Sequence, residues 1–328
     1  MSEDLRGYDE TKLENEIARL ESQLAEARRR LNNKRRGGVA TPEITDSSSQ
    51  QSSATASYTT PLTLTPSLTP KIPDPSHHYL LLLSDSALPL GSFAFSSGLE
   101  SYLAHARSPS SASLLYRPSF ASFLPLSLSS YASTTLPFVL AAHRDPVTIA
   151  TLDDVLDASI ICAVGRRAST AQGRALLSIW EKSLAPSSAV SVETRRPLEA
   201  FSAAARSSAS RKAGEVDVGG NALPPAVSAH LAPLFGAVAQ LLGLTLRQTA
   251  YVFLFSHAKA LVSAAVRASM FGPYQAQRIL ASGELQVLIA DMVEREWDTP
   301  VEEAGQSVPV MDLWIGRHEM LYSRIFNS

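Results

Sequence analysis

The chain has 328 residues, of which 45% are hydrophobic and 18% are charged, and its net charge is −2. This length accommodates one large domain or two, and the near-neutral charge excludes a global basic surface for nucleic acid or anionic lipid. Cys162 is the single cysteine, which excludes a disulfide framework and favours a reducing compartment. The N-terminus lacks the apolar segment of a secretory signal, so we expect a cytoplasmic protein.

The first predicted element is an amphipathic helix over residues 1–36. Its apolar residues alternate four and three apart, the a/d spacing of a coiled-coil seam: Leu13, Ile17, Leu20, Leu24, Ala27 and Leu31. Three heptads are short for an isolated coiled coil, so a solvated or frayed helix is the alternative. Residues 37–76 are rich in Ser, Thr and Pro, a composition that predicts a disordered linker.

Helical patterns dominate residues 77–328, which we expect to form the folded domain. This domain opens on LPLGSFAFSSGLES at 88–101, followed by an amphipathic stripe that predicts a helix over 98–106. Ser97 and Glu100 have the spacing of a capping box, so Glu100 is predicted to cap the start of that helix.

Proline and acidic residues punctuate the next segments. Pro125 and Pro137 are predicted to start or kink helices within the apolar segment 119–143. Thr151 with the acidic pair Asp153-Asp154 predicts a helix start, and that helix is expected to run to Lys182.

Small and polar residues fill 183–224, which predicts a long disordered insertion with one weak helix near 197–206. Three further helices are expected near 225–242, 245–269 and 274–297, because Gly243 and Gly272-Pro273 supply stop signals between them. No alternating period-2 segment stands out. The predicted fold is all-α, a single helical bundle domain of roughly eight to ten helices.

Motifs for catalysis and metal binding are missing from the sequence. It has neither a Gly-x-Ser-x-Gly elbow nor a Gly-x-x-x-x-Gly-Lys-Ser/Thr loop, which argues against a serine hydrolase and against nucleotide binding. The seven histidines form no His-x-x-x-His pair, and one cysteine cannot anchor a thiolate site. We therefore expect no enzyme activity, no metal site and no tightly bound cofactor.

The C-terminal stretch MDLWIGRHEMLYSRIFNS is dense in aromatic and charged residues. A helix would align Trp314 with Tyr322, and Tyr322 with Phe326, on one face. Two interpretations stay open: the tail docks on its own domain, or it is a partner epitope, since aromatics and Arg dominate binding hot spots.

Four blocks in order resemble the urease accessory protein family UreF. They are LLLLSDSALPLGSFAFSSGLES, DDVLDASIICAVGRRASTAQGRALL, FGAVAQLLGLTLRQTAYVFLFSHAKALVSAAVR with GPYQAQRIL, and RHEMLYSRIFNS. The resemblance covers residues 78–328 apart from the insertion. It implies an all-α, dimer-forming scaffold without an active site, which binds UreD (UreH) and recruits the GTPase UreG. Nickel, handled by this complex rather than held as a cofactor, would then enter apo-urease.

The resemblance carries the family's hallmark residues over to Gly91, Phe93, Ser96, Gly98, Leu99, Glu100, Arg166, Gly173, Gly236, Arg267, Gly272, His318, Glu319, Tyr322, Ser323, Arg324 and Phe326. The candidate partner-binding residues are Phe93, Phe95, Glu100, Arg267, Arg317, His318, Glu319, Tyr322, Arg324 and Phe326. Two departures stand out, because many relatives have tyrosine in place of Phe95 and acidic residues in place of Ala168 and Thr170.

Two other hypotheses remain from the sequence. Arg267 or Arg324 is a conceivable arginine finger, because such groups stabilise the charge of phosphoryl transfer. The chain is alternatively a coiled-coil adaptor, in which residues 8–36 recruit an unrelated partner.

Overall fold

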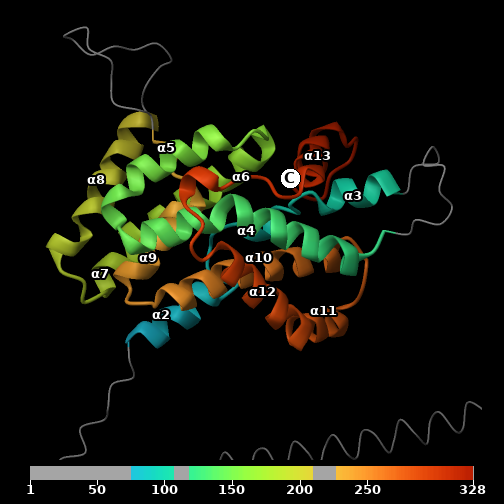
Figure 1. Ribbon diagram of the computed structural model, residues 1–328, viewed down its shortest axis with the longest axis horizontal. Coiled ribbons are helices and arrows are strands. Elements are labelled where there is room, and N and C mark those ends of the chain that lie inside the picture. Colours follow the sequence, from blue (N-terminus) through green and yellow to red (C-terminus); the bar gives the residue numbers. More distant parts are fainter. Residues whose placement is uncertain (1–74, 107–117, 210–226, 328) are drawn as a thin grey trace, which may run out of the picture. The chain divides into compact units, whose positions relative to one another are not determined.

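Figure 1 shows the computed structural model, which describes residues 75–106, 118–209 and 227–327. All of them belong to one compact unit, Thr69–Ser328. The described residues are all-α, with no strand among them, which confirms the predicted class. The predicted N-terminal helix of residues 1–36, and the linker up to residue 74, lie outside the described residues.

The helices are, in chain order, α2 (Pro75–Ser84), α3 (Leu99–Ala106), α4 (Phe120–Arg144), α5 (Ile149–Ser159), α6 (Ala163–Ile179), α7 (Ala185–Ser187), α8 (Val192–Ala209), α9 (Leu231–Leu241), α10 (Leu246–Arg267), α11 (Pro273–Leu280), α12 (Gly283–Glu296) and α13 (Pro309–Arg317). A π-helical turn, Trp180–Leu184, joins α6 to α7. Single 3-10 turns lie at Ser92–Ala94, before α3, and at His318–Met320, directly after α13.

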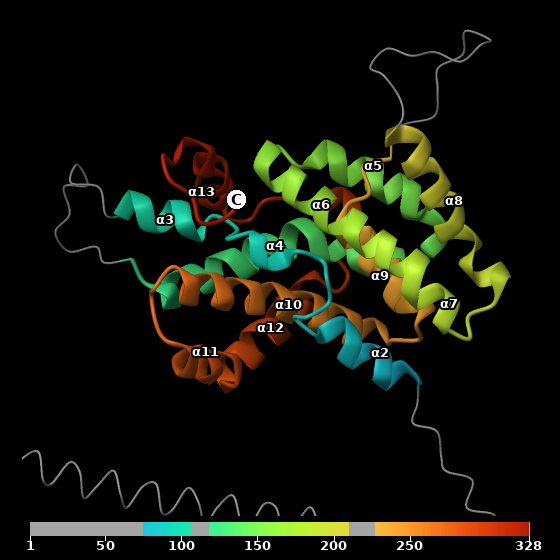
Figure 2. The ribbon, with the colours of Figure 1, turned by 180° about the vertical axis from the view of Figure 1, so that it is seen from behind.

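Helix α4 lies at the centre of the bundle and packs against α9, α10 and α12 (Figures 1 and 2). The crossing with α9 is close because Gly236 has no side chain: a Cβ there would lie 2.2 Å from the carbonyl oxygen of Val139. Apart from Gln240 near its C-terminus, α9 is apolar all round, with Leu234 and Val238 fully buried, as expected for a helix enclosed on every side.

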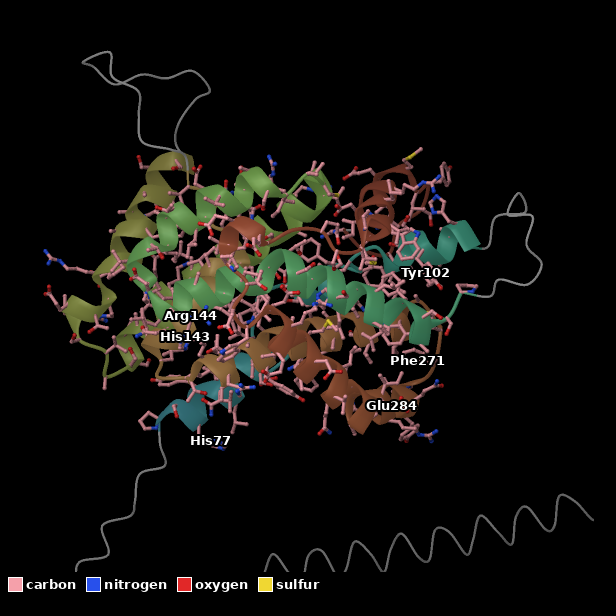
Figure 3. All side chains as sticks on the ribbon, viewed as in Figure 1. His77, Tyr102, His143, Arg144, Phe271 and Glu284 are labelled. Carbon is pink, nitrogen blue, oxygen red and sulfur yellow. The ribbon has the colours of Figure 1, made fainter. Side chains whose placement is uncertain are left out.

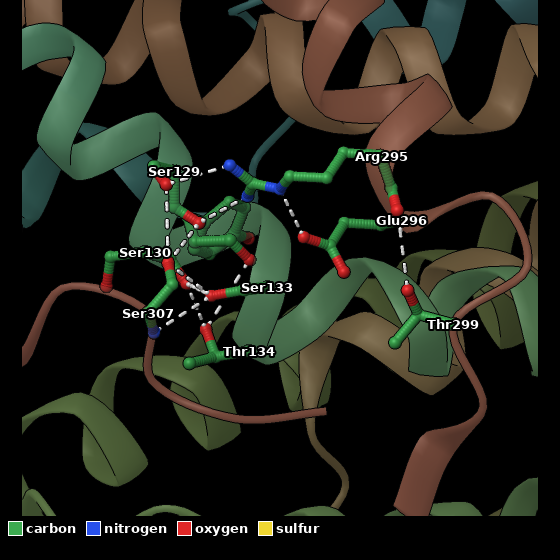
Figure 4. Close-up of polar contacts among 9 residues, drawn as sticks. Ser129, Ser130, Ser133, Thr134, Arg295, Glu296, Thr299 and Ser307 are labelled. Atoms are coloured by element: carbon green, nitrogen blue, oxygen red, sulfur yellow. Dashed lines mark hydrogen bonds and ion pairs between the residues drawn. The ribbon is translucent and has the colours of Figure 1, made fainter. Parts of the chain in front are cut away.

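No helix starts at either proline, because α4 runs unbroken through Pro125 and Pro137. A proline in a helix leaves the carbonyl four residues earlier without its N–H partner. For Pro137 that carbonyl belongs to Ser133, and it accepts the N–H of Gly305 at 3.1 Å. The segment after α12 thus supplies the missing donor, and the Ser133 hydroxyl also donates to Ser307 (Figure 4).

Figure 4 also shows how α12 is joined to α4 through Arg295. Its guanidinium donates to the hydroxyl of Ser129 at 3.0 Å and to the Ser129 carbonyl oxygen at 3.2 Å, and it pairs with the buried carboxylate of Glu296 at 2.7 Å. These contacts satisfy a carboxylate that is only 6% exposed as a residue, and they fix the face of α4 that carries Ser130 and Ser133.

The predicted single helix from Thr151 to Lys182 is also wrong, because α5 ends at Ser159 and α6 begins at Ala163. Ile160 and Cys162 have extended backbones, and the side chain of Arg166 donates to the Ile160 carbonyl oxygen at 2.7 Å. This side-chain donor satisfies a helix-end carbonyl that the helix itself leaves free.

The acidic pair has a different role from the one predicted. Asp153 lies in the middle of α5, 1% exposed, and its carboxylate accepts the backbone N–H groups of Ser228, Ala229 and His230 at 2.9, 3.0 and 2.6 Å. Asp154 is exposed. The buried carboxylate therefore holds the chain segment that enters α9, rather than the helix start.

The prediction of a disordered insertion is wrong for residues 183–209, which are largely helical. They contain α7 and α8, and Leu198 and Phe201 of α8 are 0% and 2% exposed. These two side chains attach α8 to the core, although the many Ala and Ser residues around them hide the helical period. Residues 210–224 lie outside the described residues. The helix predicted over 274–297 is two helices, because Ser282 caps α12 by accepting the N–H of Leu285.

Within the part of the chain that the structure describes, α10 alone has the length and composition of a membrane-crossing helix. Of its most apolar window, 56% is buried inside the bundle. Helix α10 packs against α4 and α12, so its apolar side chains form part of the core of the bundle.

Candidate partner-binding site

The opening stretch at 88–101 forms a sharp corner between α2 and α3. Gly98 has a φ of +85°, which L side chains rarely adopt, and a Cβ there would lie 3.1 Å from the backbone nitrogen of Ile315. The N–H of Glu100 is 3.4 Å from the hydroxyl of Ser96, which is fully buried. The corner therefore presses against α13 and needs glycine at its tightest point.

Glu100 does not cap α3 as predicted. Its carboxylate accepts three hydrogen bonds from the C-terminal tail: from Nε2 of His318 at 2.9 Å, from the N–H of Ile325 at 2.7 Å and from the N–H of Phe326 at 3.2 Å. The Glu100 side chain is 12% exposed and that of His318 is 0% exposed. A carboxylate at the start of the domain thus holds its end.

Further contacts fix the tail on the corner. The N–H of Asn327 donates to the carbonyl oxygen of Ala94 at 2.7 Å. The guanidinium of Arg267 donates to the carbonyl oxygen of Phe93 and lies 4.3 Å from the ring centre of Phe326, which is 4% exposed. Arg267 therefore lies between the two segments and stabilises both.

An aromatic cluster joins α3 and α4 to α13, the helix that precedes the tail. Tyr102 of α3, labelled in Figure 3, is 3% exposed, and its ring centre is 4.9 Å from that of Trp314 and 5.2 Å from that of Phe123. Beyond α13 the backbone leaves the helix, with Leu321 extended. The alignment that a helix would give Trp314, Tyr322 and Phe326 is therefore absent.

The docked tail leaves a row of large side chains in solvent. Met320, Tyr322 and Ile325 have exposed fractions of 79%, 107% and 63%. We call Arg317, Met320, Tyr322, Arg324 and Ile325 the tail surface; Arg317 and Arg324 are exposed as well. The tail both docks on its own domain and presents an aromatic and basic face, so the two interpretations of the sequence are compatible.

The charges beside the tail surface are mainly basic. Glu319 forms ion pairs with Arg167 of α6 and with Arg324, the latter at 3.6 Å. The hydrogen bond from Arg167 holds the pKa of the Glu319 carboxyl below its ordinary value. One carboxylate thus lies among Arg167, Arg317 and Arg324, and the net positive charge favours an acidic partner surface.

The structure brings together most of the predicted site residues, with different roles. His318 and Phe326 are buried and Glu100 is partly buried, and all three position the tail, whereas Phe93 is 64% exposed beside it. Phe95 is half-buried and faces a cavity instead. The sequence missed Arg167, Met320 and Ile325, because exposure along an irregular segment has no period from which to predict it.

Metal ligation has no support in the described ranges. No three His, Cys, Asp or Glu side chains among residues 75–106, 118–209 and 227–327 lie close enough to hold an ion together. His318 and Glu100, the nearest such pair at the site, are bonded to each other. What the site presents to solvent is the set of exposed apolar, aromatic and basic side chains of the tail surface.

Comparison with known proteins gives consistent results. The sequence model of the UreF family matches residues 117–284. The chain is 37% identical over 251 residues to an uncharacterized urease accessory protein UreF-like of Schizosaccharomyces pombe, covering 76% of this chain and 97% of that protein. It is 32% identical to urease accessory protein F of Oryza sativa, over 74% of this chain and 82% of the relative. It is 28% identical to urease accessory protein UreF of Paenarthrobacter aurescens, over 75% and 95%.

Proposed function

The chain belongs to the UreF family of urease accessory proteins, and on this basis we propose that it is a non-catalytic scaffold in urease maturation. In this proposal the domain binds UreD (UreH), recruits the GTPase UreG, and so allows nickel to be inserted into apo-urease. Nickel is the cargo of the assembled complex, and the chain holds no tightly bound cofactor. We further propose that it works in the cytoplasm as a homodimer.

The tail surface is the observation that carries the scaffold proposal. Tyr322 is fully exposed, yet the segment that bears it is fixed by Glu100, Arg267 and the buried ring of Phe326. An aromatic group that is already ordered loses little conformational entropy when a partner covers it. Arg317 and Arg324 beside it supply the charged contacts that hot spots favour.

A matched pair of tyrosines tests this. Tyr322 and Tyr274 are 107% and 90% exposed, and Tyr274 lies on α11 outside the tail surface. In a strain lacking its own UreF, Tyr322→Ala is expected to abolish urease activation with nickel supplied and to lose co-purification of UreD and UreG. Tyr274→Ala is expected to behave like the unchanged chain.

Thermal unfolding of both variants shows that each is folded, since neither ring is packed in the core. Full urease activity with Tyr322→Ala would refute the role of the tail surface. A folded chain that binds its partners but leaves urease without nickel would refute the maturation role itself.

Removal of residues 1–74 separates the scaffold from the coiled-coil adaptor. The scaffold proposal expects the remaining residues to activate urease, whereas the adaptor hypothesis expects activity to be lost with residues 8–36. Light scattering of the purified chain tests the homodimer, and its failure would leave the tail-surface test unaffected.

A further inference from the structure

A cavity of about 370 Å³, which reaches the surface at the exposed Ile161, lies between α4, α6, α9 and α10, with the opening corner and α13 at its outer end. Its size is at the lower end of the range for small-molecule pockets in proteins, roughly 300–1,000 Å³. Phe95 and Ile315 line the outer end, and Tyr131 and His257 line the inner end. Nothing in the proposed scaffold role requires this space.

Three parallel rings form one wall of the cavity. The Tyr131 ring on α4 stacks on His257 of α10, with centres 3.9 Å apart and planes at 8°, and on Phe253 at 5.0 Å and 16°. Phe235 of α9 continues the wall, with its centre 5.3 Å from that of Phe253. Because the Tyr131 ring stacks face to face on both other rings, this wall presents mainly ring edges to the cavity.

Two hydroxyls line the same space. The Ser256 hydroxyl oxygen is buried and has no hydrogen-bond partner among the described residues. Tyr131 is half-buried and lines the cavity as well, and burial raises the pKa of this phenol. Because a buried polar group without a partner is costly, the Ser256 hydroxyl is a place where a ligand would gain binding energy.

The cavity is electrically almost neutral. Burial lowers the pKa of His257 to about 3, so the ring is uncharged at pH 7, and its Nε2 lies 3.1 Å from the hydroxyl of Ser127. Among the described residues that line the cavity, Asp312 alone carries a formal charge, and it belongs to α13 at the outer end. A charged ligand in the inner part would lose its hydration without gaining a counter-ion.

We propose that the inner part of this cavity binds a small uncharged ring compound that carries a hydroxyl or similar hydrogen-bonding group. The ring lies against the aromatic wall, and its polar group bonds to the hydroxyls of Ser256 and Tyr131. The edges of the stacked rings contact the apolar face of the ligand, and the Ser256 and Tyr131 hydroxyls bind its polar group, a combination typical of small-molecule sites.

The test uses phenol, benzoate and protonated benzylamine as probes on the full chain at pH 7, with binding measured by ligand-detected NMR. Phenol is expected to bind in the millimolar range, and the two charged probes at least tenfold more weakly. Ser256→Met fills the cavity and removes the free hydroxyl. Ser263→Met, an exposed position on the same helix, is the matched control.

Phenol binding is expected to fall at least tenfold in Ser256→Met and to be unchanged in Ser263→Met. If Ser256→Met fails to fold, Tyr131→Phe keeps the ring, removes the hydroxyl, and is expected to weaken phenol about threefold to tenfold. Equal binding of phenol to all variants would mean adventitious association and would overturn the proposal. Tighter binding of benzylamine would overturn it too, because Asp312 would then define a cation site.

Discussion

The contact that the opening corner makes with the tail gives a quantitative prediction for Glu100→Ala. The change removes the acceptor of three hydrogen bonds, and the His318 ring that loses its partner is 0% exposed. Leaving one member of a buried pair without its partner costs about 3–5 kcal/mol. We expect the tail to open before the domain unfolds, because it is attached by few contacts.

Lowering the free energy of tail opening by about 3–5 kcal/mol raises the open population by about two to four orders of magnitude. Amide hydrogen exchange of Ile325 and Phe326, the two donors to Glu100, should speed up accordingly, while the amides of α9 keep their protection. Glu302→Ala, at an exposed carboxylate of the 3-10 turn after α12, is the control. Unchanged protection of the two tail amides in Glu100→Ala would refute the reasoning.

Three further predictions concern stability, each measured by urea denaturation. Gly236→Ala should lose about 2–3 kcal/mol because its Cβ meets a backbone oxygen of α4 at 2.2 Å, whereas Gly283→Ala, with nothing within 4 Å, should not. Asp153→Asn should lose about 2–4 kcal/mol, since an amide replaces the buried charge that accepts three N–H groups, and Asp154→Asn should lose almost none. The pKa of His257 is lowered to about 3 in the folded chain from 6.5 in the unfolded chain, so only the unfolded chain gains a proton as the pH falls from 6.5 toward 3, and the free energy of unfolding falls over that range. Between pH 7.5 and 5.5 this loss of stability amounts to about 1.4 kcal/mol. His257→Phe should lack that part of the pH dependence, and identical slopes would contradict the assignment.

The sequence was sufficient for the fold class and for most helices, because an apolar stripe with a 3.6-residue period reports directly on burial. It was insufficient where tertiary contacts decide a helix end. The carbonyl freed by Pro137 accepts the N–H of Gly305, and the Ile160 carbonyl at the end of α5 accepts a hydrogen bond from the side chain of Arg166. Neither donor is adjacent in sequence to the group it satisfies, so a local pattern cannot reveal it.

The candidate site likewise has features that the sequence predicts and others that only tertiary contacts decide. The residue types of the site were identified through the family resemblance, but their roles depend on distance in the fold. Glu100 has the spacing of a helix cap, yet it bonds to Ile325 and Phe326. The exposure of Tyr322 and the burial of Phe326, four residues apart, follow from a tail that is not helical, although a helix would have placed both residues on one face.

The bond between Glu100 and Ile325 also has a kinetic consequence, because it joins residues 225 positions apart. Contacts that close such long loops are expected to form late in folding. Changes at a late contact alter the rate of unfolding and leave the rate of folding nearly constant. Docking of the tail should therefore set how long the recognition surface persists once formed, and the speed with which the helical bundle assembles should not depend on it.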